Sequence, residues 1–243
     1  IESAGNDLFW VGMQDKGFCL YDHLTKKIKT TAAINGWNHG QINSMIVDDN
    51  TLWIATQLHG LLKYNIRTDS ISTVKETGEF LSIKNLLKDN QGNIWLTSPE
   101  WGLIRTPGET LKLFPLTDPP IFEHIHTILS DKEGNIWVND EDNRIVKYSL
   151  KNGIYLPHKI TLNGLTEKTD ITSLYLDEFG NIWIGTMGKG IYILDPKTEK
   201  YRVFTENEVF KNASVLSING RHNSIFASSL QGSVVHVSQG MSL

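Results

Sequence analysis

Two histidines, His124 and His126, lie one residue apart in "PPIFEHIHTIL" and are candidate metal ligands. On a β-strand, residues i and i+2 point to the same side, so both imidazoles could bind one metal ion. No third ligand stands at a spacing that would complete the site. Because the chain has 8 histidines in 243 residues, such proximity also arises by chance. We therefore expect no metal site at this pair.

An acidic run, Asp140, Glu141 and Asp142, is the second candidate metal site. Calcium takes about six to eight oxygen ligands, and neighbouring carboxylates supply several of them. Arg144 follows in the same loop and offers these carboxylates a cation at short range. The sequence favours a solvated turn with Arg144 as the ion-pair partner over a calcium site.

Trp37, in "INGWNHGQ", and Trp101, in "SPEWG", are candidate ligand-binding aromatic residues. Flat aromatic rings offer apolar contact to the C–H faces of sugar rings, and nearby polar groups fix the orientation of a ligand. Each tryptophan could instead cap its sheet or pack against a neighbouring domain.

The sequence contains no recognisable catalytic motif. No spacing indicates a nucleophile with its base, and nothing singles out two carboxylates that would face each other across roughly 5–10 Å, as in glycosidases. We therefore expect no catalytic residue and no cofactor. Because distant loops can assemble an active site, an enzyme stays the alternative.

An internal repeat must position all of these residues. Its anchors follow one another at intervals of 43, 42, 42, 46 and 43 residues and are Trp10, Trp53, Trp95, Trp137, Trp183 and Phe226. In three copies the turn Asp-x-x-Gly-Asn precedes the anchor. In four copies a glycine stands seven residues after it, whereas the fourth copy has Arg144 at that place.

Each repeat predicts four short strands. Asp can bond the backbone ahead of it and Gly accepts a positive φ, so the turn before the anchor favours a tight hairpin. Four strands at this period are typical of one β-propeller blade, with the anchor packed between neighbouring blades. The sequence predicts an all-β fold, a β-propeller of four-stranded antiparallel blades. About six repeats fit a six-bladed ring or an incomplete seven-bladed one.

Residues 1–243 are expected to be a single propeller domain or a large fragment of one. The first and last repeats are incomplete, and the chain opens within a repeat, so we expect it to be part of a longer protein.

Propeller topology gathers the candidate binding residues on one face. Loops between second and third strands lie at the same end of each blade as the connections to the next blade, and the Asp-Gly turns lie at the other end. We expect the loop end to carry Lys16, Trp37, His39, His59, Glu100, Trp101 and Lys189, together with His124 and His126.

Composition excludes several classes of protein. A net charge of −4 and a pI of about 6.1 argue against nucleic-acid binding, which needs a basic face. The single cysteine, Cys19, permits no intrachain disulfide. No run of apolar residues is long enough to span a membrane, so we expect no membrane contact by this segment.

The stretch "DEFGNIWIGTMGKGIYILD" resembles the two-component regulator propeller repeat. Its matching residues are Asp177, Gly180, Asn181, Ile182, Trp183, Ile184, Gly185, Thr186, Gly188, Gly190 and Ile191. Copies at 89–103 and 131–146 match less fully, and the resemblance covers nearly the whole chain.

This resemblance implies the periplasmic sensor region of a hybrid two-component histidine kinase. The implied function is non-catalytic: the domain recognises an oligosaccharide or polysaccharide fragment and signals to a kinase outside this chain. The phosphoacceptor-His box, the Gly-rich ATP-binding boxes and a receiver domain are not found here. The resemblance also implies contacts with other domains of the receptor, which is expected to be a homodimer.

Two alternatives stay open. Streptogramin lyases share a similar propeller, so the chain could be a lyase or hydrolase acting on a small molecule or glycan. It could also be a scaffold that mediates only contacts between domains or receptor copies. A large apolar surface on the loop end, without a polar-lined pocket, would favour the scaffold.

Overall fold

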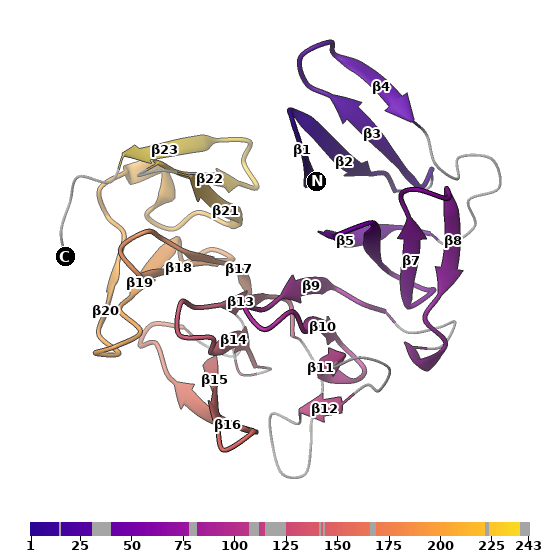
Figure 1. Ribbon diagram of the computed structural model, residues 1–243. Helices are drawn as coiled ribbons and strands as arrows, with labels where there is room; N and C mark the ends of the chain where they lie inside the picture. Colours follow the sequence, from indigo (N-terminus) through magenta and orange to yellow (C-terminus); the bar gives the residue numbers. More distant parts are fainter. Residues whose placement is uncertain are drawn as a thin grey trace. The chain divides into compact units, whose positions relative to one another are not determined.

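The described part of the chain folds into β-sheets, apart from two short 3-10 helices. The computed structural model describes residues 1–14, 16–30, 40–77, 82–106, 112–114, 125–140, 142, 144–165, 169–221 and 224–238. These residues form six antiparallel sheets, the blades of a β-propeller (Figure 1), and this confirms the predicted fold class. In the described part of the chain, no helix is long and apolar enough to cross a membrane.

Every blade is a meander in which neighbours along the chain are neighbours in the sheet. Blades 1 and 2 contain β1 (Glu2–Gly5), β2 (Leu8–Gly12), β3 (Phe18–Asp22), β4 (Lys27–Thr30), β5 (Ile42–Asp48), β6 (Thr51–Thr56), β7 (Leu61–Asn65) and β8 (Ser70–Thr73). Blades 3 and 4 contain β9 (Asn85–Lys88), β10 (Ile94–Ser98), β11 (Gly102–Thr106), β12 (Lys112–Phe114), β13 (Ile128–Ser130), β14 (Ile136–Asn139), β15 (Ile145–Lys151) and β16 (Ile154–Ile160).

Blade 5 has four strands and blade 6 has three among the described residues. They contain β17 (Ile171–Leu176), β18 (Ile182–Thr186), β19 (Ile191–Leu194), β20 (Tyr201–Val203), β21 (Val215–Arg221), β22 (Ser224–Ser229) and β23 (Val234–Ser238). The 3-10 helices are η1 (Lys75–Thr77) and η2 (Glu208–Phe210).

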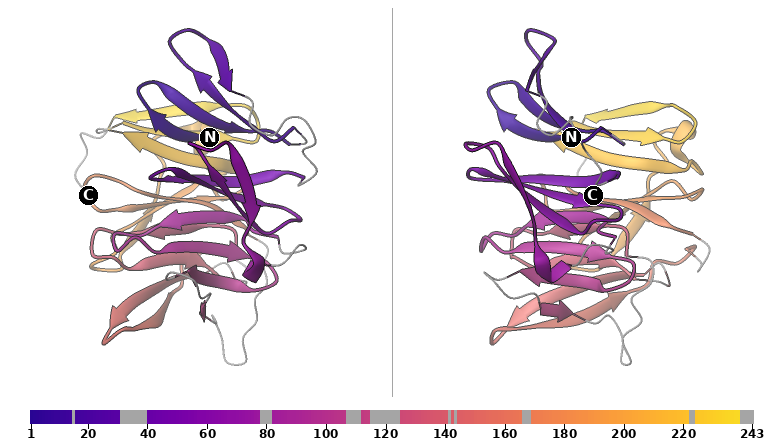
Figure 2. Two further views of the ribbon diagram at one scale, coloured as in Figure 1. Left: turned by 45° about the vertical axis from the view of Figure 1, so that its right-hand side comes forward. Right: turned by 90° about the vertical axis from the view of Figure 1, so that its right-hand side faces the viewer.

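The blades fall into two compact units of three blades each. Ile1–Glu123 holds blades 1–3 and His124–Leu243 holds blades 4–6. Inside each unit, successive blades pack face to face over apolar clusters, and Figure 2 shows the layered sheets of the first unit. The burial of these apolar faces is the main driving force for the stacking of blades.

Most anchor tryptophans are buried, and Trp10, Trp137 and Trp183 belong to apolar clusters between blades. Trp10, Trp95, Trp137 and Trp183 are each at most 4% exposed, and the half-buried Trp53 packs against the cluster that joins blades 2 and 3. The prediction of a packed anchor is wrong for the sixth repeat. Phe226 is 47% exposed and stacks on His236, because no further blade follows blade 6 in the described part of its unit.

The Asp-x-x-Gly-Asn turn does more than reverse the chain, because its aspartate also binds the anchor. In blade 3, Asp89 Oδ1 accepts the backbone N–H of Asn93 at 2.8 Å, and Asp89 Oδ2 accepts Trp95 Nε1–H at 2.7 Å. Blades 4 and 5 repeat these bonds with Asp131 to Trp137 at 2.8 Å and Asp177 to Trp183 at 2.9 Å. The turn therefore gives a buried indole the acceptor it needs.

Blade 2 lacks this bond. Its hairpin is shortened to a turn at Asp49 and Asn50, with Asp49 at a φ of 51°, so no aspartate lies six residues before Trp53. Trp53 Nε1 is buried and has no hydrogen-bond partner among the described residues. The Trp53 ring instead contacts Lys63, whose Nζ lies 4.5 Å from the ring centroid, in a cation–π arrangement.

Four polar ties between blades run from the side chains of one blade to the main chain of the next. In the first unit, Asn43 Nδ2 donates to the carbonyl oxygen of Ile83 at 2.8 Å, and Ser44 Oγ accepts from the N–H of Leu86 at 3.2 Å. In the second unit, Thr172 Oγ1 donates to the carbonyl of Val215 at 2.6 Å, and Ser173 Oγ accepts from the N–H of Ile218 at 2.9 Å. These residues stand where the register of the first strand shifts. In both units, the side chains come from the first strand of one blade and the main-chain groups come from the blade that follows it.

In blades 1, 2 and 5 the turns between third and fourth strands share an Asx geometry. The Oδ1 atoms of Asp22, Asn65 and Asp195 each accept the N–H groups of the residues two and three positions ahead, at 2.8–3.4 Å. Asp195 also accepts from Thr198 Oγ1 at 2.7 Å, and this bond is the main reason why the pKa of Asp195 lies below its usual 3.8.

We expect the Asp195→Asn variant to be less stable than the wild type at pH 7, by under about 1 kcal/mol because the turn is solvated. The amide keeps one acceptor oxygen for the backbone N–H groups, as Asn65 does in blade 2, but it removes the charge and the second oxygen that accepts from Thr198 Oγ1. A lowered pKa in the folded state stabilises the fold above about pH 4, and this contribution is lost as the pH falls below that value. The difference in urea midpoint between the two proteins should therefore be smaller at pH 3 than at pH 7. A difference that stays constant with pH would contradict the role of the charge.

Candidate functional site

The loops between second and third strands are rigid five-residue turns. Thr56 closes one of them, since its N–H and Oγ1 both donate to the carbonyl of Gly60 at 3.1 and 2.9 Å. Thr186 and Gly190 repeat the arrangement in blade 5 at 3.1 and 2.7 Å. Gly60 and Gly190 have φ values of 66° and 71°, a conformation that glycine adopts without strain. Residues in these loops are thus presented from fixed positions at the end of each blade.

The first unit places four predicted residues at the loop ends of its blades. Lys16 is exposed in the β2–β3 loop, and His59 is half-buried in the β6–β7 loop. Glu100 and Trp101 are adjacent in the β10–β11 loop. Glu100 accepts Ser98 Oγ–H at 2.8 Å, and Trp101 is 43% exposed. The loop end of this unit therefore offers one exposed indole beside a carboxylate.

The second unit carries the remaining described candidates. Lys189 is exposed in the β18–β19 loop, and the half-buried His126 donates its backbone N–H to Asn139 Oδ1 at 2.9 Å. Three of the predicted residues lie outside the described part of the chain, namely Trp37, His39 and His124.

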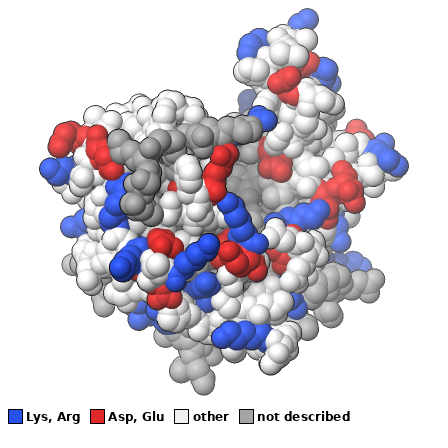
Figure 3. Space-filling model, turned by 60° about the vertical axis from the view of Figure 1, so that its left-hand side comes forward, with Lys and Arg blue, Asp and Glu red and all other residues white. Residues whose placement is uncertain are grey.

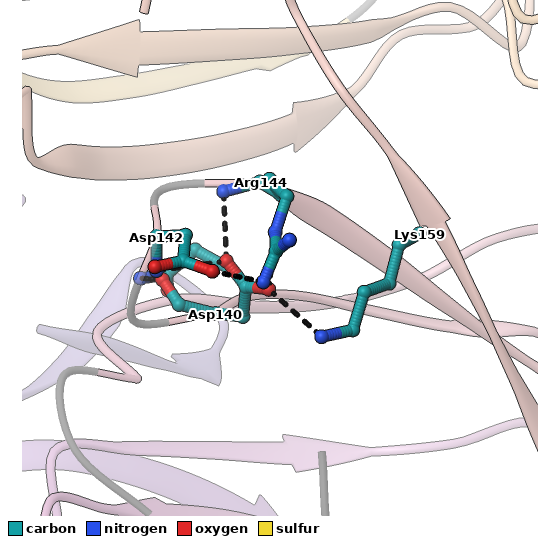
Figure 4. Close-up of polar contacts among 5 residues, drawn as sticks. Asp140, Asp142, Arg144 and Lys159 are labelled. Atoms are coloured by element: carbon teal, nitrogen blue, oxygen red, sulfur yellow. Dashed lines mark hydrogen bonds and ion pairs between the residues drawn. The ribbon is translucent and has the colours of Figure 1, made fainter. Parts of the chain in front are cut away.

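The acidic loop of blade 4 is organised around Asp140, which is 1% exposed (Figure 4). Asp140 Oδ1 accepts the backbone N–H groups of Asp142 and Arg144 at 3.1 and 2.9 Å. Asp140 Oδ2 accepts Arg144 Nε–H at 2.8 Å and lies 3.4 Å from Lys159 Nζ. Arg144 also pairs with Asp142. Burial raises the pKa of the nearby Tyr148 hydroxyl, and the charge of Asp140 raises it further.

This loop copies the Asp turn found at the opposite end of blades 3 to 5. Asp140 takes the place of the turn aspartate, and the guanidinium of Arg144 takes the place of the Asn side chain four residues on. Asp140 is therefore held by two cations inside the blade, whereas the sequence favoured a solvated turn. Among the residues that the structure describes, no group of three His, Cys, Asp or Glu side chains is arranged to hold a metal ion.

A depression of about 380 Å³ lies at the loop end of the second unit. It is bounded by the segment around η2 and by the β22–β23 loop, and its polar rim consists of Glu208, Lys211, Asn212 and Gln231. Buried Ala213 and Ser229 also line it. Carboxylate, ammonium and amide groups around one hollow can donate and accept several hydrogen bonds to a polyhydroxylated ligand.

Sequence reasoning missed this depression because its residues are ordinary polar loop residues. The available signal was positional: they lie in a blade connection and in a loop between second and third strands, the segments predicted to form the binding face. On the face drawn in Figure 3, Lys and Arg side chains are interspersed with Asp and Glu. That face therefore does not form a uniformly basic surface.

Comparison with solved structures identifies proteins of the same fold. The crystal structure described as the extracellular domain of the hybrid two-component system BT4673 from B. thetaiotaomicron is 17% identical, with a TM-score of 0.76. The match covers 99% of this chain and 32% of that one. PorZ of the type-IX secretion system of Porphyromonas gingivalis is 14% identical with a TM-score of 0.75, over 97% of this chain and 38% of PorZ. The chain thus spans about a third of the length of these proteins.

An enzyme also shares the fold. Virginiamycin B lyase from Staphylococcus aureus is 14% identical with a TM-score of 0.60, and the match covers 82% of this chain and 70% of the lyase. No curated protein sequence matches the chain. At such low identities the similarity concerns the fold alone.

One segment of the sequence also matches a known protein family. Residues 164–188, which contain the turn Asp177–Asn181 and the anchor Trp183, match the two component regulator propeller family. This segment overlaps residues 177–195, the stretch whose sequence resembles that repeat. The chain therefore carries a two-component regulator propeller repeat on a β-propeller fold that it shares with the extracellular domain of a hybrid two-component system.

Proposed function

We propose that this chain is a non-catalytic sensor module of a hybrid two-component system, located outside the cytoplasmic membrane in the periplasm. The observation that carries the proposal is the two-component regulator propeller repeat at residues 164–188. The shared fold with the extracellular domain of such a system supports the same function and location. The kinase would lie in a part of the receptor outside this chain.

The ligand in this proposal is a glycan fragment bound at the loop end. Two features support it: the exposed indole of Trp101 beside Glu100, and the polar depression that includes Asn212 and Gln231. An indole face can contact the C–H face of a sugar, while amides and charges bind its hydroxyl groups. Ligand binding changes signalling only if its affinity differs between two states of the receptor, which we propose to be a homodimer.

The first test is a thermal-shift screen of the purified chain against oligosaccharides, with and without calcium. A ligand that binds only the folded state raises the midpoint by mass action. The products of each incubation are then examined by mass spectrometry. An unchanged oligosaccharide is expected, and cleavage would favour the lyase or hydrolase alternative. A well-folded sample that responds to no sugar would overturn glycan recognition by this chain.

Substitutions then locate the binding site. We expect Trp101→Ala, or the double change Asn212→Ala and Gln231→Ala, to weaken the affinity for the identified sugar by about tenfold or more. Glu133→Ala is the matched control, because Glu133 is exposed in the turn at the opposite end of blade 4. Titration calorimetry measures all three variants. Unchanged affinity in both site variants would place the ligand elsewhere.

A further inference from the structure

A hollow of about 430 Å³ lies between blades 4 and 5, within the second unit. Its residues come from the two-stranded ribbon of β15 and β16 (Figure 1) and from Glu199 in the turn between β19 and β20. This turn and the turn between β15 and β16 lie at the end of the blades opposite the loop end. The hollow is therefore separate from the depression that the proposed function uses.

The register of the ribbon places alternate side chains of both strands on the face that lines the hollow. Lys147 of β15 stands opposite His158 of β16. Two residues further along β15, Ser149 stands opposite Leu156. Lys151 follows Ser149 on the same face, because residues i and i+2 of a strand point to one side. Two ammonium groups therefore flank one hydroxyl group, and an apolar side chain lies beside them.

Two contacts hold parts of the hollow in position. Lys147 Nζ lies 5.1 Å from the ring centroid of the fully buried Trp137, in a cation–π arrangement. His158 Nε2 lies 3.0 Å from Glu199 Oε1, and this contact joins the ribbon to the blade 5 turn. Glu199 is fixed in that turn, because its N–H donates to the carbonyl of Asp195 at 2.8 Å. One cation and the far wall of the hollow are thus positioned before any ligand binds.

The ribbon concentrates positive charge in a chain whose net charge is −4. Residues 145–160 contain three lysines and no aspartate or glutamate. One of them, Lys159, lies on the other face and pairs with the buried Asp140. Among the residues that the structure describes, no carboxylate lies within ion-pair distance of Lys147 or Lys151. Within that part of the chain, the hollow therefore has two positive charges without a counter-charge.

A doubly charged oxyanion matches this arrangement. Its two negative charges balance those of the two lysines, and its tetrahedral oxygens can accept hydrogen bonds from both ammonium groups and from Ser149 Oγ–H together. The hollow is larger than an oxyanion alone, because its volume falls within the roughly 300–1,000 Å³ of small-molecule sites. Leu156 and Pro157 offer the rest of such a ligand an apolar wall.

We infer that this hollow binds a sulfate or phosphate group that is carried as an ester by a small organic molecule. Lys147, Ser149 and Lys151 bind the oxyanion, and the apolar wall contacts the organic part. The inference is independent of ligand recognition at the loop end, because the hollow and the depression there share no residue.

Titration calorimetry at low ionic strength tests the site, because salt screens exposed charges. The probes are glucose 6-sulfate and glucose 6-phosphate, with inorganic sulfate and glucose as comparisons. We expect both esters to bind, inorganic sulfate to bind about tenfold more weakly than glucose 6-sulfate, and glucose to give no binding heat. Absence of binding by both esters would overturn the inference. Equal affinities for inorganic sulfate and glucose 6-sulfate would overturn the assignment of an ester and leave a site for the free ion.

Three variants locate the binding of glucose 6-sulfate. Lys147→Gln and Lys151→Gln should each raise its dissociation constant by about tenfold. Lys197→Gln is the matched control, because it makes the same change in charge at an exposed residue of the β19–β20 turn that does not line the hollow. It should leave the affinity nearly unchanged.

Melting temperatures of the free variants show whether each one is folded. Lys147→Gln also removes the contact with Trp137, so Lys151→Gln, which changes an exposed side chain, decides the outcome if the first variant is unstable. A loss of affinity as large in Lys197→Gln as in Lys151→Gln would mean general attraction to a basic surface and would overturn the site.

Discussion

Replacing Asp177 by Asn is expected to lower the free energy of unfolding by about 2–4 kcal/mol. The Asp177 side chain is 2% exposed and accepts the Asn181 N–H at 2.8 Å, Asn181 Nδ2–H at 3.1 Å and Trp183 Nε1–H at 2.9 Å. A carboxylate accepts at both oxygens. The amide of Asn must turn its NH₂ group toward at least one of these donors, so a buried donor loses its acceptor and faces another donor.

Urea denaturation at pH 7 measures this effect. Glu178→Gln is the control, because it makes the same chemical change one residue later at an exposed position. It should shift the midpoint only slightly. A loss below about 0.5 kcal/mol in Asp177→Asn would mean that the turn closes without the carboxylate. The fold does tolerate an anchor indole without this acceptor, as Trp53 shows. In blade 2, however, the shorter hairpin contains no turn aspartate, so no carboxylate is replaced there.

Gly190→Ala is expected to be equally damaging, at about 3 kcal/mol or more. Gly190 has a φ of 71°, and a Cβ atom there would lie 2.3 Å from the carbonyl oxygen of Phe210. The N–H of Gly190 also donates to the carbonyl of Ala213 at 3.1 Å. The main chain of the blade 5 loop is therefore in contact with the main chain of the connection to blade 6. Neither segment can move apart to make room for a Cβ atom without breaking this hydrogen bond.

Gly188→Ala separates the two causes of the loss. Gly188 lies in the same loop with a φ of 77°, but a Cβ atom there meets nothing within 4 Å. Gly188→Ala should therefore cost only the strain of a positive φ, about 1 kcal/mol. Thermal and urea unfolding of both variants give the difference. Equal losses would show that backbone conformation matters and that close contact with Phe210 does not.

The sequence predicted the blades well because their determinants are local. The Asp-x-x-Gly-Asn turn, the apolar strands and the glycine after the anchor all act within one repeat, so their spacing marks each hairpin. The bond from Asp89 to Trp95 was not predicted, although the constant separation of six residues was visible. The bond forms only in one orientation of the buried indole, and spacing alone does not give that orientation.

The candidate binding site was harder to predict because loops from different repeats contribute to it. Trp101 could be placed at the loop end from topology, and it is exposed there. The rim residues Asn212 and Gln231 could not be distinguished from other polar loop residues before the hollow between them was known. Asp140 was predicted to be solvated because an acidic run is usually exposed. Asp140 is buried beside Arg144 and Lys159, and Lys159 comes from β16, the last strand of the same blade.

The ties between blades have a consequence for how such chains change over time. Asn43, Ser44, Thr172 and Ser173 each bind a carbonyl or N–H group of the main chain of the following blade. Every repeat presents the same main-chain groups, whatever its side chains are. A repeat can therefore be duplicated, deleted or exchanged for a distant copy while the junction keeps its hydrogen bonds. Junctions of this kind let whole blades act as interchangeable parts, and they tolerate wide divergence in sequence within one architecture.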